Sequence, residues 1–261
     1  MSDYETICLE LDQNLAVLTL NRPQALNALS NKMKEEILQV IRHISNPKSG
    51  IRALMITGEG KGFCSGADLG EDKDTSWDAG ANLIDTYHPL MLELMSLQIP
   101  VISAVNGVAA GAGMSLAISA DIVVAAKSAY FLQAFVNIGL CPDAGSTYLL
   151  PRLIGEARAK AIMMLGEKVP AEKAKDWGMI YEVFEDEDLI PTARNMAMKI
   201  ANGPSLAYAG IKKLTAVSSR NGYSDQLQAE ALVQRMASQS GDAREGISAF
   251  LEKRKALFKG C

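Results

Sequence analysis

The sequence predicts an α/β fold with a helical C-terminal region. Over the first two thirds of the chain, short apolar strands alternate with small-residue turns and helical segments. The apolar strand at Val101–Val105, for example, enters a glycine-rich turn at 107–113, in which an apolar helix begins. After residue 151 helical patterns dominate. At 261 residues the chain is near the upper size for one hydrophobic core. We therefore expect a core over residues 1–200 and a helical region over residues 201–261.

The N-terminal elements follow from apolar patterning and capping residues. Residues 7–11 and Leu15–Leu20 read as two strands around a polar turn, and the second is nearly all apolar and therefore buried. Ser30 is a good N-cap for a helix over Asn31–Ser45. Residues 52–57 form another apolar strand, after which comes the loop GEGKGFCSGADL.

The middle of the chain continues the alternation. Residues 70–80 are polar and acidic, which predicts a mobile loop over a cleft, with an ordinary solvated surface as the alternative. A helix over 81–97 leads to the strand VISAV, and the segments MSLAISA and DIVVAA predict a helix and a strand.

The C-terminal third is predicted to be mainly helical. Such regions with exposed apolar faces often cover an active site or make subunit contacts. The expected helices span residues 155–165, 171–177, 191–201, 205–219, 223–238 and 242–258.

Composition limits the possible classes of function. A net charge of −4 gives no basic surface for nucleic acid. The 4 cysteines show no metal-binding spacing and fit free thiols in a reducing compartment, and only 2 histidines are present, so we expect no metal site. The N-terminus has no signal-peptide pattern, and no apolar run is long enough to span a membrane. We expect a cytoplasmic protein without membrane or nucleic-acid partners.

Two small-residue turns and one carboxylate are the candidate chemical groups. The turns FCSGADL and AAGAGMSL each follow an apolar strand and can present backbone N–H groups. A pair of such donors can stabilise the oxyanion that forms from a carbonyl. Asp143 is a lone acid in an apolar stretch after Pro142. Two ordinary tight turns, and an aspartate that serves only in a turn, are the alternative interpretations.

Taken together, the chain resembles the crotonase (enoyl-CoA hydratase/isomerase) superfamily along nearly its whole length. The segments that carry the resemblance keep their order and spacing: NRPQALNAL, GKGFCSGADL, PVISAVNGVAAGAGMSLAISADIVVAA, GLCPDAGSTYLLPRLIG, AEKAKDWGMIYEV and EGISAFLEKRKALF. The resemblance implies a spiral of ββα units, a helical C-terminal region that builds trimers or hexamers, and an acyl-CoA thioester as ligand. It implies no separate cofactor, since coenzyme A is part of the substrate.

The resemblance also implies roles for individual residues. The oxyanion-hole donors match the N–H groups of Ala67 and Ala112, and the adenine end of coenzyme A would lie near Ala25 and Ala67. Phe250 and Lys253 would approach it from a neighbouring subunit, whereas Gly70 replaces a lysine that many relatives carry. The implied substrate- and CoA-binding residues are Ala25, Ala67, Asp68, Leu69, Ala112, Phe135, Phe250 and Lys253.

Departures from the family pattern indicate the reaction. The two glutamates of the hydratases match Ser115 and Phe135, neither of which transfers protons at neutral pH. Asp143 matches the aspartate of ring-epoxide isomerases that act on phenylacetyl-CoA derivatives. The sequence on both sides of Asp143 also resembles the sequences of those enzymes, which belong to phenylacetate catabolism. We expect Asp143 to move one proton through an enolate, with its pKa raised by burial among residues 135–141.

Three alternatives remain open. One is a hydratase-like enzyme that uses Asp143 alone. A second is an enzyme like 4-chlorobenzoyl-CoA dehalogenase, because His88 stands where that enzyme carries a catalytic histidine; Phe135, however, replaces its tryptophan, and we favour a structural role for His88. The third is a non-catalytic binding or assembly member. In the helix that some relatives use to bind RNA, the 2 lysines are accompanied by 2 glutamates, which argues against an RNA-binding role.

Overall fold

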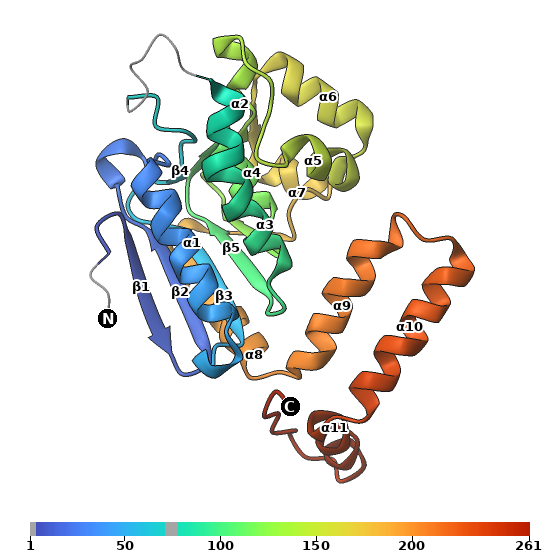
Figure 1. Cartoon of the computed structure of the whole chain (residues 1–261). Coiled ribbons are helices and arrows are strands. Elements are labelled where there is room, and N and C mark those ends of the chain that lie inside the picture. Colours follow the sequence, from blue (N-terminus) through green and yellow to red (C-terminus); the bar gives the residue numbers. More distant parts are fainter. Residues whose placement is uncertain (1–3, 71–77) are drawn as a thin grey trace.

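The computed structural model describes residues 4–70 and 78–261 and confirms the predicted α/β class (Figure 1). Within these residues the larger sheet has six strands in the order β1-β2-β3-β5-β7-β10. Only the β1–β2 pair is antiparallel, and the other neighbours are parallel. The strands are β1 (Ile7–Asp12), β2 (Leu15–Leu20), β3 (Ala53–Gly58), β5 (Val101–Val105), β7 (Ile122–Ala126) and β10 (Glu182–Phe184).

A second sheet of four short strands lies beside the first and generates the spiral. Its order is β4-β6-β8-β9, with β9 antiparallel to β8. β4, β6 and β8 follow β3, β5 and β7 after short connections, so each turn of the chain contributes one strand to each sheet before a helix begins. This is the ββα repeat that the resemblance implies. The strands are β4 (Gly62–Cys64), β6 (Val108–Ala110), β8 (Tyr130–Leu132) and β9 (Lys168–Pro170).

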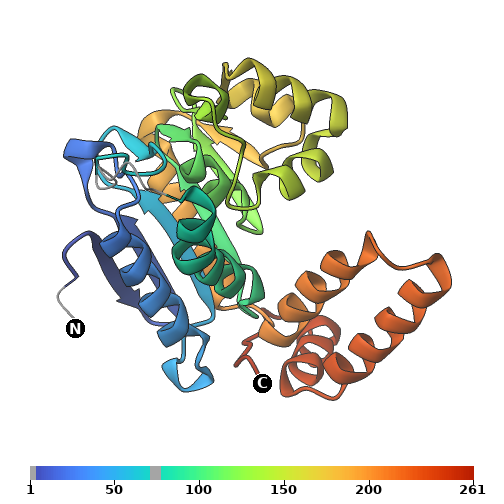
Figure 2. The ribbon, with the colours of Figure 1, turned by 45° about the horizontal axis from the view of Figure 1, so that its top comes forward.

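Helices cover both faces of the larger sheet. α1 (Asn31–Ser45) and α3 (His88–Ser96) pack against each other on one face, and α8 (Asp186–Ala201) contacts β3, β5 and β7 on the other (Figures 1 and 2). α1 has the predicted bounds because the Ser30 hydroxyl accepts a hydrogen bond from the Met33 N–H at 3.1 Å. The inner strands are mostly apolar because both of their faces are buried.

The helix predicted over 81–97 contains an irregular segment. It consists of α2 (Ala79–Asn82), the π-helical turn η3 (Leu83–Tyr87) and α3, which follow one another without a break. π-helical turns are rare and occur frequently at functional sites. Most of the acidic segment predicted as a loop over a cleft, residues 71–77, lies outside the described residues.

Four helices follow in or near the core. α4 (Ala112–Ile118) is wholly buried, and α7 (Ala171–Asp176) contacts β8, β9 and β10. α5 (Ser146–Ile154) and α6 (Glu156–Leu165) pack against each other. The sequence did not predict α5, β4, β8, β9 or β10, and it took β6 as part of a turn.

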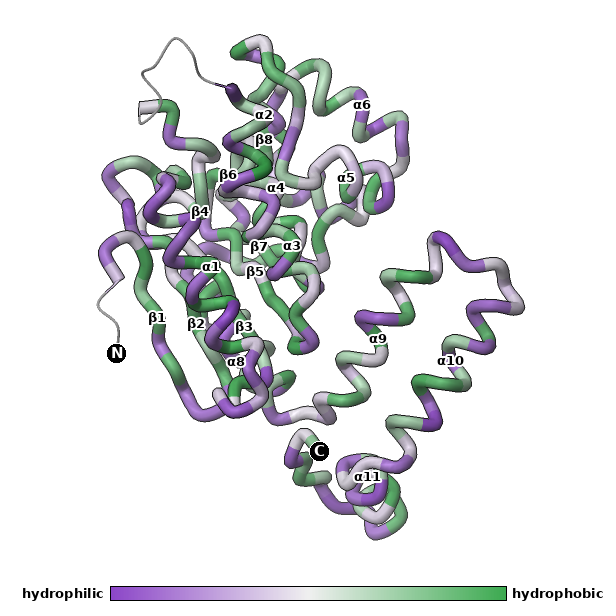
Figure 3. Tube along the Cα trace, viewed as in Figure 1, coloured by the Kyte–Doolittle hydropathy of each residue, from purple (hydrophilic) through white to green (hydrophobic). Residues whose placement is uncertain are grey.

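The last three helices extend away from the sheets (Figure 1). They are α9 (Ser205–Ser218), α10 (Tyr223–Ser238) and α11 (Gly241–Leu251). Arg52 ties their base to the core, since its guanidinium donates hydrogen bonds to Ser205 Oγ at 2.9 Å and to the carbonyl of Phe258 at 3.2 Å. Apolar residues recur along α9 and α10 (Figure 3), and many are exposed in the single chain. The domain boundary at residue 200 and the trimeric assembly stay predictions.

In the part of the chain that the structure describes, none of the helices has both the length and the apolar character needed to cross a membrane.

Candidate active site

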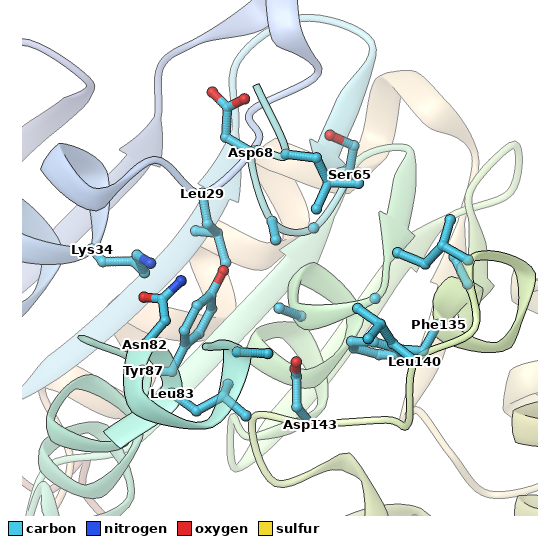
Figure 4. A pocket seen from close by; sticks show the side chains of 18 of the residues that line it. Leu29, Lys34, Ser65, Asp68, Asn82, Leu83, Tyr87, Phe135, Leu140 and Asp143 are labelled. Atoms are coloured by element: carbon cyan, nitrogen blue, oxygen red, sulfur yellow. The ribbon is translucent and has the colours of Figure 1, made fainter. Parts of the chain in front are cut away.

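A cavity of about 350 Å³ lies where the two predicted turns meet the segment that carries Asp143 (Figure 4). Its walls come from the turn after β4, from α1, from α2 and η3, from the start of α4, and from residues 134–143. This size suits a small acyl group. The cavity therefore brings together segments that are far apart in the sequence.

The turn after β4 presents the N–H of Ala67. The N–H of Leu29 donates to the Gly66 carbonyl at 2.7 Å, and the N–H of Asp68 donates to the Leu29 carbonyl at 3.3 Å. Leu29 therefore forms backbone hydrogen bonds with Gly66 and Asp68, the residues on both sides of Ala67. In such a parallel bridge the N–H of the middle residue, Ala67, points away from Leu29. Gly66 permits this path with a φ of +104°, a value that favours glycine.

The second turn presents the N–H of Ala112, the first residue of α4, which has no acceptor within its own helix. The two turns are in close contact. A Cβ on Gly66 would lie 2.9 Å from the Ala110 carbonyl oxygen and 3.6 Å from the Ala112 nitrogen. A Cβ on Gly113 would lie 2.4 Å from the Cys64 carbonyl oxygen. Glycine at both positions allows β4 and α4 to approach closely, so that both N–H groups serve one cavity.

Asp143 is one of the two aspartates among the described lining residues of the cavity. Its Oδ1 is buried and has no hydrogen-bond partner among the described residues. Burial raises the pKa of this carboxyl to about 6, and the Lys34 ammonium lowers it by a smaller amount. The rise has the direction and the cause that the sequence predicts. A carboxyl with a pKa near neutrality can both take and return a proton at physiological pH.

The backbone around Asp143 is held by two serine hydroxyls. Ser115 Oγ and Ser146 Oγ each donate to the Asp143 carbonyl at 3.0 Å, and Ser115 is fully buried. The next residue, Ala144, has a φ of +48°, which is unfavourable for a residue with a side chain. Ser115, which stands where the hydratases carry a glutamate, therefore joins α4 to the segment that carries Asp143.

Six of the predicted site residues line this one cavity: Ala67, Asp68, Leu69, Ala112, Phe135 and Asp143. The carboxylate of Asp68 forms an ion pair with Arg22 at 2.7 Å and accepts a hydrogen bond from the Gly70 N–H. The hydrogen bond from Arg22 is the largest influence on Asp68 and lowers the pKa of its carboxyl. Asp68 thus stays ionised.

The other three predicted residues do not line the cavity. The Ala25 carbonyl accepts a hydrogen bond from Ser65 Oγ at 3.1 Å, which places it behind the first turn. Phe250 is 82% exposed near the end of α11, and Lys253 is exposed just beyond that helix. Both were expected to act on a neighbouring subunit, and that expectation stays a prediction.

The sequence missed five polar lining residues among those described: Asn31, Lys34, Ser65, Asn82 and Tyr87. Lys34 is 4% exposed, although a lysine on an amphipathic helix normally reads as a surface residue. The one available signal was its place on the α1 face that also carries Met33 and Ile37.

His88 lies outside this cavity. It is exposed and lines a separate apolar groove of about 390 Å³ between α3 and α5, together with Tyr148 and Leu149. This position favours the structural role that the sequence suggests for His88. It also removes the main support for a dehalogenase-like mechanism.

Comparison with known proteins gives a consistent result. A family model described as enoyl-CoA hydratase/isomerase matches residues 10–261. A relative from Rhodobacter capsulatus named probable enoyl-CoA hydratase is 44% identical, covering 98% of this chain and 99% of that protein. A relative from Escherichia coli named 1,2-epoxyphenylacetyl-CoA isomerase is 42% identical, covering 98% and 99%.

Solved structures agree with the fold. A putative enoyl-CoA hydratase from Streptomyces coelicolor is 34% identical with a TM-score of 0.93, covering 100% of this chain and 96% of that one. A putative enoyl-CoA hydratase/isomerase from Mycobacterium abscessus is 35% identical with a TM-score of 0.91, covering 97% and 98%. The chain therefore belongs to the crotonase family, that is, to the enoyl-CoA hydratase/isomerase enzymes.

Proposed function

We propose that the protein is an acyl-CoA thioester isomerase in which Asp143 is the single acid/base. The observation that carries the proposal is the buried, unbonded Oδ1 of Asp143 in the cavity that Ala67 and Ala112 line. A carboxyl of this kind can exchange a proton with a bound substrate. Names of relatives support the class, since one is an epoxyphenylacetyl-CoA isomerase and another a decenoyl-[acyl-carrier-protein] isomerase.

The proposed reaction moves one proton within the acyl group. The thioester oxygen accepts hydrogen bonds from the N–H groups of Ala67 and Ala112. Asp143 Oδ1 takes a proton from a carbon near the carbonyl, and the C–H electron pair moves into an enolate whose charge the two donors stabilise. The same carboxyl then returns the proton to a different carbon, so that the double bond has moved and Asp143 ends as it began. No separate cofactor is required.

Hydration is disfavoured because this site lacks a second acid at the positions the hydratases use. The Ser115 hydroxyl donates its hydrogen bond to the Asp143 carbonyl, and the aromatic side chain of Phe135 has no group that can transfer a proton. Asp68, the other carboxylate among the described lining residues, is held ionised by Arg22. Adding water across a double bond needs a base for the water and an acid for the carbanion. The name of the Rhodobacter relative keeps a hydratase-like activity as the second candidate.

For the substrate we favour 1,2-epoxyphenylacetyl-CoA or a related enoyl-CoA, as the Escherichia coli relative suggests. We further propose that the protein acts in the cytoplasm as a trimer or a pair of trimers. In such an assembly the exposed Phe250 and Lys253 can reach the coenzyme A of a neighbouring subunit.

The test is incubation with 3-enoyl-CoA, 2-enoyl-CoA and epoxyphenylacetyl-CoA, with products identified by mass. Isomerisation should shift the double bond or expand the epoxide ring without a change of mass, and in D₂O it should bring deuterium into the product. Accumulation of 3-hydroxyacyl-CoA from 2-enoyl-CoA as the main product would instead support the hydratase.

A further inference from the structure

A buried asparagine joins the segment 22–29 to the β3–β4 connection, residues 58–62. Asn27 is fully buried, and its side-chain amide donates hydrogen bonds to the carbonyl of Glu59 at 3.0 Å and to that of Gly62 at 2.8 Å. Glu59 follows β3, and Gly62 begins β4, the strand that leads into the first cavity turn. The proton transfer proposed above makes no use of this side chain.

The backbone at Asn27 is held in a conformation that few residues adopt. Its φ is +58°, and the φ of the preceding Leu26 is +48°. Asparagine tolerates this left-handed region, whereas leucine does so at a cost. Two hydrogen bonds to Arg22 maintain it: Asn27 Oδ1 accepts from the Arg22 N–H at 2.8 Å, and the Asn27 N–H donates to the Arg22 carbonyl at 2.9 Å. Strain of this kind persists where surrounding contacts fix it, and it clusters at functional sites.

The segment around Asn27 supports the turn after β4. The Leu26 carbonyl accepts a hydrogen bond from the Ser65 N–H at 2.9 Å. The backbone of Leu29 bonds the residues on both sides of Ala67, and these bonds set the direction of the Ala67 N–H. Leu26 and Leu29 lie one residue before Asn27 and two residues after it. Any shift of Asn27 would therefore move the backbone groups that orient the donor.

A second asparagine binds the same β3–β4 connection. Asn106, between β5 and β6, donates to the carbonyl of Gly58 at 2.8 Å and to that of Gly60 at 3.0 Å. Its Oδ1 accepts a hydrogen bond from the Gly58 N–H at 3.2 Å. These bonds hold the connection but do not reach the segment around Asn27. The pair therefore separates support of the connection, which both asparagines give, from support of the segment behind the donor.

We propose that Asn27 is a positioning residue that fixes the direction of the Ala67 N–H and thereby sets the strength of its hydrogen bond to the thioester oxygen. A hydrogen bond weakens steeply as its donor turns away from the acceptor, so a small rotation of this peptide matters. The inference rests on the proposed function in taking the thioester oxygen as the acceptor for Ala67 and Ala112. It deepens that function by naming a residue behind the donor.

The infrared carbonyl stretch of a bound thioester tests this role without turnover. The probe is hexanoyl-CoA labelled with carbon-13 at the carbonyl, and two N–H donors should lower its C=O stretching frequency when it binds the full-length protein. Asn27→Gly is the decisive variant, because glycine takes a φ of +58° without strain and loses only the side-chain bonds. It should lose most of this lowering. Asn106→Ala is the matched control and should keep it.

Steady-state kinetics of double-bond isomerisation gives a second readout. Removing an oxyanion-hole donor altogether costs about 10²–10³ in kcat, so misdirecting one in Asn27→Gly should lower kcat about tenfold or more. KM should stay within about threefold, because the donor acts mainly on the developing charge. Asn106→Ala should keep kcat within about threefold. If Asn27→Gly does not fold, Asn27→Asp serves instead, since it keeps the acceptor and removes the two donated bonds.

An unchanged carbonyl stretch in Asn27→Gly would overturn the proposal, even if the affinity for hexanoyl-CoA fell. An equal loss of the frequency shift in both variants would also overturn it, because the β3–β4 connection as a whole would then be the support. No frequency shift in the unaltered protein would refute the proposed contact of the thioester with Ala67 and Ala112, and this inference with it. A shift that Asn27→Gly abolishes, in a protein that does not isomerise, would refute the proposed reaction and leave this inference standing.

Discussion

Two aspartates in one cavity differ in what surrounds their carboxyls. Asp68 is paired with Arg22, which lowers the pKa of its carboxyl, whereas burial raises the pKa of Asp143 to about 6. Outside the folded protein the two aspartate side chains would have the same pKa. The difference teaches that the environment, not the residue type, decides which carboxyl is suited to proton transfer, and it supports the role proposed for Asp143.

Replacing each aspartate by asparagine gives the largest contrast. Asp143→Asn should lower kcat for double-bond isomerisation by about 10²–10⁴-fold, because it removes the general base while keeping the shape. Asp68→Asn is the matched control and should retain most of kcat, since Asp68 serves to hold the turn. Steady-state kinetics on both variants measures kcat. A similar fall in kcat for the two variants would show that the two carboxyls do not differ in their role.

The pH dependence of kcat should report Asp143 rather than Asp68. Because Asp143 must begin as a carboxylate, kcat should fall on the acid side with a midpoint near pH 6, about tenfold for each further pH unit. A pH–rate profile between pH 4.5 and 8 measures it. An acid limb centred near pH 4 would show that the carboxyl behaves as an ordinary exposed aspartate.

The stability of the two variants should change with pH in different ways. The pKa of Asp143 is raised from 3.8 to about 6 in the folded protein, so its charge destabilises the fold above pH 6 and has no effect below about pH 4. Asp143→Asn should therefore raise the free energy of unfolding by about 1–2 kcal/mol at pH 8, a value reduced for partial solvent exposure. The gain should disappear at pH 4.

For Asp68 the sign is the opposite, because a lowered pKa means that its charge stabilises the fold at neutral pH. Asp68→Asn should destabilise the protein at pH 8. Urea unfolding at pH 4 and pH 8 checks both signs, and a stability gain for Asp68→Asn at pH 8 would contradict the opposed shifts.

The smallest expected effect concerns how Asp143 is held. Ser115→Ala removes one of the two hydroxyls on the Asp143 carbonyl, which should cost about 1 kcal/mol of stability. We expect kcat to fall about threefold or more with KM nearly unchanged, because misplacing a catalytic group affects the transition state more than binding. Ser119→Ala, which removes a buried hydroxyl elsewhere near α4, is the control and should leave kcat unchanged.

The sequence predicted those parts of the fold whose pattern is local. β2 and α1 were predicted with their observed bounds, since one is continuously apolar and the other has a serine cap and an amphipathic face. The three-residue strands β4, β8, β9 and β10 were missed because pairing with distant segments defines them. α5 was missed because Pro151 lies within it, where proline normally ends a helix.

The site residues also fall into those that a local sequence pattern predicts and those that it does not. The two turns and Asp143 could be predicted because glycine-rich motifs and a lone acid in an apolar stretch are visible in the sequence. Lys34 and Tyr87 could not be, since their place in the cavity depends on η3, and a π-helical turn leaves little signal in the local pattern. The bond from Ser115 to the Asp143 carbonyl joins residues 28 positions apart and needed coordinates.

The tight fit of Gly113 against Cys64 has a consequence for how such a site can diversify. Any larger residue at 113 would force the two strand–turn units apart, so the pair of amides is built into the scaffold before a thioester arrives. Positions 34, 135 and 143 line other walls of the cavity and are free of that constraint. Different side chains at these positions can therefore give different reactions, while the two N–H groups proposed to bind the carbonyl keep their places.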